Sequence, residues 1–245
     1  MDVCAVVPVK KFDQSKSRLS SLLEGEERIE LSRTLLQDIL NTLLLCRELT
    51  KIVVVTSDPS AKEITENLGL ECLLQSEDKG VNSAIRCADR YLYQANIGTS
   101  ITVPCDLPLL LRQDIDYVCH LIPGRGSSVI ICPSYKFDGT NLLVRNPFNI
   151  FSDTRYDCSS FQGHLEASIK AGACTKVLLC SRLMIDLDTP EDLPLVLSSN
   201  TSPNKSISYL RKIGKNSFSS SFASAEVAPQ RYTTDRVSTS ATDQS

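Results

Sequence analysis

Short apolar runs alternate with helix-like periodicity along the first 198 residues, and this alternation constrains the fold more than any other feature. The runs are rich in Val and Ile and end at turn residues, as buried strands do. They lie at 3–9, 51–57, 70–75, 100–105, 127–133 and 176–180. Strands that alternate with helices predict an α/β fold, with a central, mostly parallel sheet flanked by helices.

The segments between these runs carry the period of amphipathic helices. Residues 26–49 repeat apolar side chains on one helical face, among them Leu36, Ile39 and Leu43. Further helices are predicted at 80–96, 114–122 and 160–171. Because ligands of open α/β sheets bind beyond the carboxyl ends of the strands, we expect the functional residues to lie there.

Composition and charge exclude several classes of protein. The chain has 245 residues and a net charge of −3, and no apolar run approaches the roughly 18 residues of a membrane span. Its first apolar run precedes the lysines, which is the reverse of a secretory signal. A protein that binds nucleic acids without specificity needs a basic surface, and the net negative charge of this chain argues against such a function. We therefore expect a cytoplasmic protein that binds neither membranes nor nucleic acid.

The ten cysteines are predicted to be reduced structural thiols. None pairs with another at the C-x-x-C spacing of zinc and redox sites, and most lie in apolar segments. The two histidines, His120 and His164, have no partner at a metal-ligand spacing, so both are interpreted as surface or packing residues. These patterns favour a reducing cytoplasm over an oxidising compartment.

Residues 199–245 differ in composition from the rest of the chain. Ser and Thr make up 17 of these 47 residues, whereas Ile, Leu, Val and Phe make up 7. That apolar share lies below the roughly 20% under which a segment seldom buries enough surface to order itself. We therefore expect one folded domain over residues 1–198, followed by a disordered tail.

A basic loop follows the first predicted strand. It carries Lys10, Lys11, Lys16 and Arg18 in a domain whose 20 basic and 26 acidic residues leave a net charge of −6. Lys and Arg side chains at a strand end suit a triphosphate, because Arg clamps phosphate with two hydrogen bonds and Lys supplies a mobile charge. The glycine patterns of Walker and dinucleotide-binding loops are absent. The alternative is a solvated loop without a ligand.

A rigid acidic turn follows the fourth predicted strand, in the sequence PCDLPL. Asp106 lies there between Pro104 and Pro108, and prolines restrict the backbone. Carboxylate oxygens held in this way are natural Mg²⁺ ligands. The alternative is that Asp106 only stabilises a turn or caps a helix.

A second acidic segment, IDLDTPEDL, follows the last predicted strand. Asp186 and Asp188 are two residues apart, so in an extended segment both point the same way. Thr189 and Pro190 then open a helix, and the acids after them suit its first turn. All these acids could serve the helix alone. Because Asp186 and Asp188 precede the cap, we interpret them as further ligands of the metal.

Taken in order, these motifs resemble the 2-phospho-L-lactate guanylyltransferase family, which makes the guanylylated intermediate of the deazaflavin coenzyme F-420. The stretches that carry the resemblance are VPVKKFDQSKSRLS, GVNSA, VPCDLPLL, DGTNLLV, SSFQGHLEAS and DLDTPEDL. They run from about residue 1 to residue 197 and leave the tail unmatched.

The resemblance implies a glycosyltransferase-A-like nucleotidyltransferase domain over residues 1–198, with GTP as substrate and Mg²⁺ as cofactor. The acceptor would be a small phosphorylated carboxylic acid: 2-phospho-L-lactate, phosphoenolpyruvate or 3-phosphoglycerate. GMP would be transferred to its phosphate, and pyrophosphate would be released. The sequence leaves a homodimer open.

The resemblance also assigns roles to individual residues. Lys16 and Arg18 would contact the triphosphate, and the charge of the basic loop adds Lys10 as a further candidate substrate contact. The remaining roles are metal binding by Asp106 and Asp188, acceptor binding by Thr140 and Ser160, and a place near the nucleoside for Asn82.

One position departs from the family pattern. Asp157 stands where the family carries a glycine whose backbone approaches the acceptor. A carboxylate there would repel an anionic acceptor unless it turns away. Asp157 is therefore a candidate substrate-binding residue that bears on the identity of the acceptor.

Two other readings stay open. Molybdopterin guanylyltransferases and sugar-phosphate nucleotidylyltransferases share the fold, although they usually carry a glycine-rich loop after the first strand, and residues 8–18 contain no Gly. The other alternative is a non-catalytic nucleotide-binding module. The presence of both Asp106 and Asp188 argues against it, since a pure binder does not need both.

Overall fold

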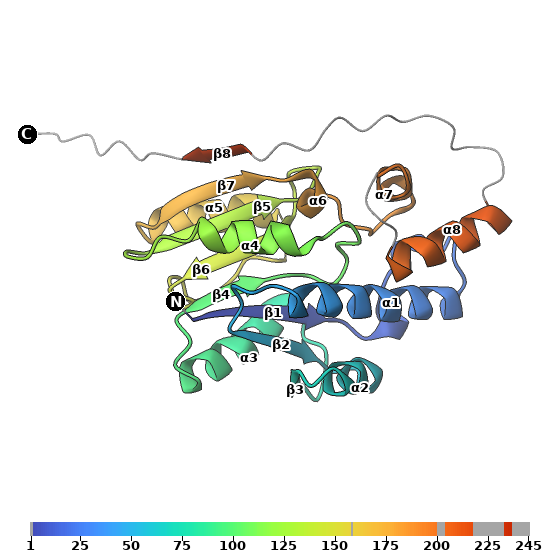
Figure 1. Ribbon diagram of the computed structural model, residues 1–245, viewed down its shortest axis with the longest axis horizontal. Helices are drawn as coiled ribbons and strands as arrows, with labels where there is room; N and C mark the ends of the chain where they lie inside the picture. Colours follow the sequence, from blue (N-terminus) through green and yellow to red (C-terminus); the bar gives the residue numbers. More distant parts are fainter. Residues whose placement is uncertain (1, 158, 200–203, 218–232, 237–245) are drawn as a thin grey trace, which may run out of the picture.

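The computed structural model describes residues 2–157, 159–199, 204–217 and 233–236 of the chain. Its described strands form a sheet in the order β3-β2-β1-β4-β6-β5-β7-β8 (Figure 1). The strands are β1 Val3–Val9, β2 Lys51–Thr56, β3 Glu71–Leu74, β4 Thr99–Thr102, β5 Ser128–Pro133, β6 Thr140–Asn146, β7 Cys174–Leu179 and β8 Thr233–Arg236. The helix-flanked α/β architecture predicted from the alternation is confirmed.

The sheet is mostly parallel, as predicted. Pairs β3–β2, β2–β1, β1–β4 and β5–β7 are parallel, whereas β6 is antiparallel to both β4 and β5. Strand β6 was not predicted, because Asn141 and Arg145 interrupt its apolar pattern. Arg145 is fully buried and makes bonds of 2.6 and 3.0 Å to the carboxylate of Asp89, so its charge is paired inside the fold.

Helices cover both faces of the sheet. The α-helices are α1 Gly25–Leu44, α2 Pro59–Asn67, α3 Val81–Gln94, α4 Arg112–His120, α5 Ser160–Lys170, α6 Ser181–Met184, α7 Leu193–Leu197 and α8 Lys205–Ser217, with 3-10 turns η1 Phe12–Gln14, η2 Ser17–Leu19 and η3 Pro190–Asp192. In β1, Ala5 and Val7 pack toward α1, α2 and α4, while Cys4 and Val6 pack toward α3. This alternation follows from the two-residue repeat of a strand.

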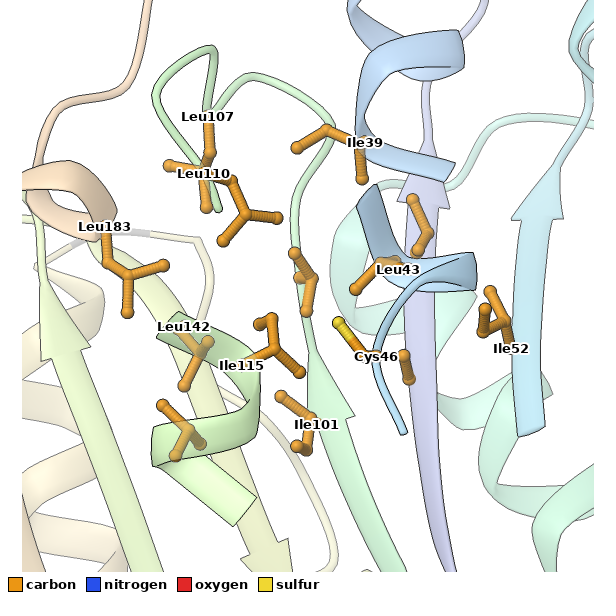
Figure 2. Packing of buried hydrophobic residues seen from close by; sticks show 14 of the residues in the cluster. Ile39, Leu43, Cys46, Ile52, Ile101, Leu107, Leu110, Ile115, Leu142 and Leu183 are labelled. Atoms are coloured by element: carbon orange, nitrogen blue, oxygen red, sulfur yellow. The ribbon is translucent and has the colours of Figure 1, made fainter. Parts of the chain in front are cut away.

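The largest apolar cluster lies between the sheet and the layer of α1 and α4. Figure 2 shows Ile39 and Leu43 from α1 facing Ile52 of β2 and Ile101 of β4, with Ile115 of α4 beside them. Removing such a Leu or Ile side chain from water contributes about 1.5–3 kcal/mol. The cluster therefore fixes the strand ends from which the loops of the site leave.

The expectation of disorder is wrong for residues 204–217. Helix α8 begins after Asn204, whose side-chain oxygen accepts the backbone N–H of Ile207 at 2.9 Å, as a helix cap does. Ile207, Leu210 and Ile213 are buried, and α8 packs beside α1 (Figure 1). Apolar residues at helical spacing thus order this part in spite of the polar average. Strand β8 pairs with β7, and the rest of the predicted tail lies outside the described residues.

The nine described cysteines are free thiols, in agreement with the prediction, and Cys158 lies outside the described residues. Burial raises the pKa of Cys105 and of Cys119 to about 12, so these thiols stay protonated at neutral pH. In the part of the chain that the structure describes, no helix has the length and apolar character required to cross a membrane.

Candidate active site

A cavity of about 720 Å³ opens at the edge of the sheet where β1, β2, β3 and β4 end. Ser57 follows β2 and Gln75 follows β3, and both line it. Because β6 is antiparallel to β4, its first residue, Thr140, reaches the same edge. The predicted site residues that line this cavity are Lys10, Lys16, Arg18, Asp106, Thr140, Ser160, Asp186 and Asp188.

The basic loop brings two cations to the acidic residues. Lys16 has a φ of 53°, in the left-handed region that costs a non-glycine residue roughly 1–2 kcal/mol. Its ammonium lies 3.1 Å from Asp106 Oδ2 and 3.9 Å from Asp188 Oδ1, and Arg18 lies 2.7 Å from Asp188 Oδ2. Burial by itself would lower the pKa of Lys16, but the charges around it, Asp106 foremost, leave that pKa raised.

The two acidic segments meet although they are about eighty residues apart in the chain. The backbone N–H of Leu187 donates to the carbonyl oxygen of Asp106 at 2.9 Å, and this bond places Asp188 beside Asp106. Thr189 and Pro190 open η3 as predicted, and Asp192 accepts the N–H groups of Asp188 and Thr189 at 2.9 and 2.6 Å. The capping role therefore belongs to Asp192 and leaves Asp188 free to face the cavity.

Asp186 lies deeper in the same cavity. Its Oδ1 accepts a hydrogen bond of 3.0 Å from Asn141 Nδ2. Burial and the neighbouring charge of Asp106 raise the pKa of Asp186 to about 6. Asp186 therefore takes up a proton more readily than an ordinary aspartate does.

The donor set fits a divalent ion that arrives with its phosphates. Among the described residues, no group of three or more His, Cys, Asp or Glu could hold a metal by itself. Mg²⁺, however, usually binds through one or two carboxylates together with substrate phosphates and water. Asp106 and Asp188, which share the ammonium of Lys16, provide the two carboxylates.

The end of the cavity formed by β6 and α5, away from β2 and β3, offers hydroxyl groups. Ser160 begins α5, directly after Ser159, and is buried at the cavity wall. Thr140 is also buried there, with its Oγ1 3.0 Å from His164 Nδ1. Hydroxyl groups and the N-terminal end of a helix favour an anionic group.

Two predicted substrate-binding residues are not among the described residues that line the cavity. The side-chain oxygen of Asn82 accepts Thr154 Oγ1 at 2.8 Å and the N–H of Tyr156 at 3.0 Å, so Asn82 holds the 154–156 loop. Asp157 is exposed outside the cavity wall. Its carboxylate is therefore not part of the wall at which it would repel an acceptor.

Sequence reasoning missed the residues of the end formed by β2 and β3. Asp78 lines the cavity there, and its Oδ1 accepts the N–H of Gly80 at 2.8 Å. Its Oδ2 is buried and has no hydrogen-bond partner among the described residues, and the same holds for Ser57 Oγ. The signal was available, because Asp78 follows a predicted strand by three residues. His164 was interpreted as a surface or packing residue, and it is a packing residue, fully buried against the site.

Comparison with known proteins identifies the family. The model of the family described as "Guanylyl transferase CofC like" matches residues 3–230. The chain belongs to this family. The match extends beyond residue 197, so the expectation that the tail is unmatched is wrong, and α8 lies within the family's domain.

Curated relatives agree with this assignment. A phosphoenolpyruvate guanylyltransferase of Rubrobacter xylanophilus is 32% identical over 79% of this chain and 92% of the relative. A 2-phospho-L-lactate guanylyltransferase of Methanobrevibacter smithii is 28% identical over 86% and 91%.

A crystal structure of a putative nucleotide-diphospho-sugar transferase from Desulfovibrio desulfuricans superposes with a TM-score of 0.69. It is 16% identical and covers 88% of this chain and 96% of that one, so it supports the fold alone.

Proposed function

We propose that this CofC-like protein transfers GMP from GTP to the phosphate of a small phosphorylated carboxylic acid and releases pyrophosphate. The observation that carries the proposal is the meeting of Lys16, Asp106 and Asp188 at one point of a cavity with two chemically different ends. The names of the relatives support phosphoenolpyruvate and 2-phospho-L-lactate as acceptors. The coenzyme F-420 pathway and a cytoplasmic location belong to the same proposal.

The two ends of the cavity suit the two substrates. Val81 and Ala84 give the β2–β3 end an apolar wall, and the carboxylate of Asp78 would repel an anion there but accept N–H donors of a base. Guanine presents two such donors on one edge. The other end, with Thr140 and Ser160, supplies hydroxyl groups for a carboxylate. The base would therefore bind beside Asp78 and the acceptor beside Thr140.

Asp106 and Asp188 would hold Mg²⁺ together with the triphosphate, with Asp186 next to them. The ion would supply positive charge that stabilises the leaving pyrophosphate. Lys16 and Arg18 extend this positive charge from the protein side. Two like unit charges 4 Å apart repel by about 4 kcal/mol at an effective dielectric constant of 20. The acceptor phosphate and the triphosphate carry several negative charges each, so they can approach one another only if cations offset this repulsion.

The transfer needs no general base. A phosphomonoester has a second pKa of about 6 and is largely dianionic at neutral pH. One of its oxygens forms the bond to the α-phosphorus of GTP, while the bond from the α-phosphorus to the bridging oxygen of the β-phosphate breaks. The electron pair leaves with pyrophosphate, and no proton has to move. Accordingly, the site brings cations rather than a Cys–His pair to the phosphates.

A plate assay tests the proposal. Purified protein with Mg²⁺ is given each of the four nucleoside triphosphates with 2-phospho-L-lactate, phosphoenolpyruvate or 3-phosphoglycerate, and pyrophosphate release is measured. We expect release with GTP and at least one acceptor. Release only with CTP or UTP would indicate a sugar-type nucleotidylyltransferase, and GTP binding without release would indicate a binding module.

The metal assignment is tested by Asp106→Asn. We expect it to lower Mg²⁺-dependent release at least 100-fold, because it removes one of the two carboxylates that would hold the ion (a loss of about 2.7 kcal/mol or more). The control is Asp13→Asn, in which an exposed carboxylate on the basic loop loses the same charge. Unchanged release by Asp106→Asn would contradict the assignment.

A further inference from the structure

His164 is a buried titratable group that the transfer chemistry leaves unused. It lies on α5 with no exposed surface, between the rings of Tyr156 at 4.7 Å and Phe151 at 6.3 Å. Both ring nitrogens have partners. Nε2 is 2.9 Å from the backbone nitrogen of Arg155, and Nδ1 is 3.0 Å from Thr140 Oγ1.

These contacts determine which nitrogen carries the proton. A backbone N–H can only donate, so Nε2 must accept from Arg155 and cannot carry a proton. Burial, together with the charges of Arg145 and Arg155, lowers the pKa of His164 to about 3, so the ring is neutral. A neutral imidazole has one N–H, which must then be on Nδ1. Nδ1 therefore donates to the oxygen of Thr140.

This direction leaves the hydroxyl hydrogen of Thr140 available. An oxygen that accepts from Nδ1 must turn its own hydrogen elsewhere, and Thr140 lines the cavity. The reverse direction would require a proton on Nε2, which would face the N–H of Arg155 at 2.9 Å. The backbone of residue 155 thus sets the direction of the hydrogen bonds through the ring to the hydroxyl.

We propose that His164 is a positioning residue that fixes the hydroxyl of Thr140 as a hydrogen-bond donor toward the acceptor substrate. The inference rests on the proposed function for the identity of that substrate, and it sharpens the substrate class. A hydroxyl held as a donor binds a group that only accepts, such as a carboxylate or phosphate oxygen. His164 touches neither substrate and acts through Thr140.

Two substitutions separate the contacts of the ring. In His164→Asn the side-chain nitrogen takes the place of Nδ1, so the donor to Thr140 is kept. In His164→Gln the side-chain oxygen takes the place of Nε2, so the acceptor for Arg155 is kept and the donor is lost. Thr140→Val removes the hydroxyl, and Thr140→Ser keeps it. All variants are compared by thermal unfolding.

The first readout is the KM for the acceptor, with the KM for GTP as internal control. We expect His164→Gln to raise the acceptor KM about tenfold, the effect of one hydrogen bond, with little change for GTP. His164→Asn should restore most of the affinity, as Thr140→Ser should relative to Thr140→Val. In the double variant Thr140→Val/His164→Gln, the second change should add nothing. An unchanged KM in His164→Gln, or effects that multiply in the double variant, would overturn the proposal.

The second readout does not depend on activity. The chain has only two histidines, so nitrogen-detected NMR of the wild-type protein, with His120→Gln for assignment, reports the ring of His164. We expect a proton on Nδ1 and none on Nε2 at neutral pH. The opposite tautomer would refute the positioning role even if the variants do not fold. If no acceptor is guanylylated but the tautomer is as expected, the proposed function fails and the direction of the bond stands.

Discussion

Lys16 occupies the place in this site where charge is most concentrated. Its side chain is 7% exposed and lies between the carboxylates of Asp106 and Asp188, which are far apart in the sequence. A buried ammonium needs such partners, because an unpaired charge is very costly away from water. The residue therefore organises the site before any ligand binds.

Asp78 is the residue that we expect to recognise guanine by hydrogen bonding. Its Oδ2, which has no partner in the part of the chain that the structure describes, can accept from the N1–H and amino group of guanine. Asp78→Asn should raise the KM for GTP at least tenfold, because a buried polar group would be left without its hydrogen-bond partner. It should improve use of xanthosine triphosphate, whose base carries a carbonyl oxygen in place of the amino group. Steady-state assays with both nucleotides measure this.

The same substitution at Asp13 provides the comparison for Asp78→Asn. It removes an equal charge from the exposed part of the basic loop. If Asp78→Asn leaves the preference for GTP over xanthosine triphosphate as in the Asp13 variant, Asp78 does not contact the base.

Asp186 makes stability depend on pH. Its pKa is raised from 3.8 to about 6 on folding, so the folded protein holds a proton that the unfolded chain releases. The stabilisation is complete below pH 4 and is lost as the pH rises through 6. Asp186→Asn, which cannot ionise, should match the wild type near pH 4 and be more stable above pH 6. Urea unfolding at pH 4, 5, 6 and 7 tests this, and a difference independent of pH would contradict it.

At the scale of elements, α8 is held by specific contacts rather than by composition. Besides its cap at Asn204, the N–H of Ser206 donates to the buried carboxylate of Asp38 on α1 at 2.7 Å. The Nδ2 of Asn204 donates to the carbonyl oxygen of Pro108 at 2.7 Å, next to the turn that carries Asp106. The helix therefore braces the acidic turn from outside the cavity.

Leu210 provides the test of this packing. It is 3% exposed in the cluster of α1 and α8, so Leu210→Ala should lower the free energy of unfolding by about 2–5 kcal/mol. The neighbouring Arg211 is exposed, and Arg211→Ala should change it by less than about 0.5 kcal/mol. Equal midpoints for the two variants in urea would show that α8 does not pack as described.

At the scale of the whole molecule, one apolar cluster joins the last described helix to the site. It contains Leu210 of α8, Leu31 of α1, Leu19 of the basic loop and Leu187, which lies between Asp186 and Asp188 in the sequence. Displacement of α8 would expose Leu19 and Leu187 and release the neighbouring charged residues. Stability and activity are therefore expected to change together when α8 is lost.

Truncation tests this coupling. A chain that ends at Ser199 lacks α8 and should lose several kcal/mol of stability, at about 1.5–3 kcal/mol for each buried side chain, together with most of its pyrophosphate release. A chain that ends at Ser217 keeps the helix and should retain both properties. Full activity in the shorter chain would contradict the role of α8.

The amino-acid sequence by itself indicated six of the strands, several of the helices and most of the candidate residues that line the cavity. Val-rich runs and helical spacing are local signals, so they identified β1 and α1 directly. The rule that ligands bind at strand ends then selected Lys16, Asp106 and Asp188. Strand β6 and helices α2 and α8 were not predicted. Arg145 interrupts the apolar pattern of β6, and an average over 47 residues hides that of α8.

Only the tertiary structure decided how distant residues pair. The bond between Leu187 and Asp106 joins the acidic segments, and the N–H of Arg155 fixes the ring of His164. The structure also left Asp157 exposed outside the cavity wall and placed Asn82 where its side chain holds the 154–156 loop. Such pairings depend on the direction of individual hydrogen bonds between segments that the chain brings together only on folding, so residue type and spacing cannot specify them.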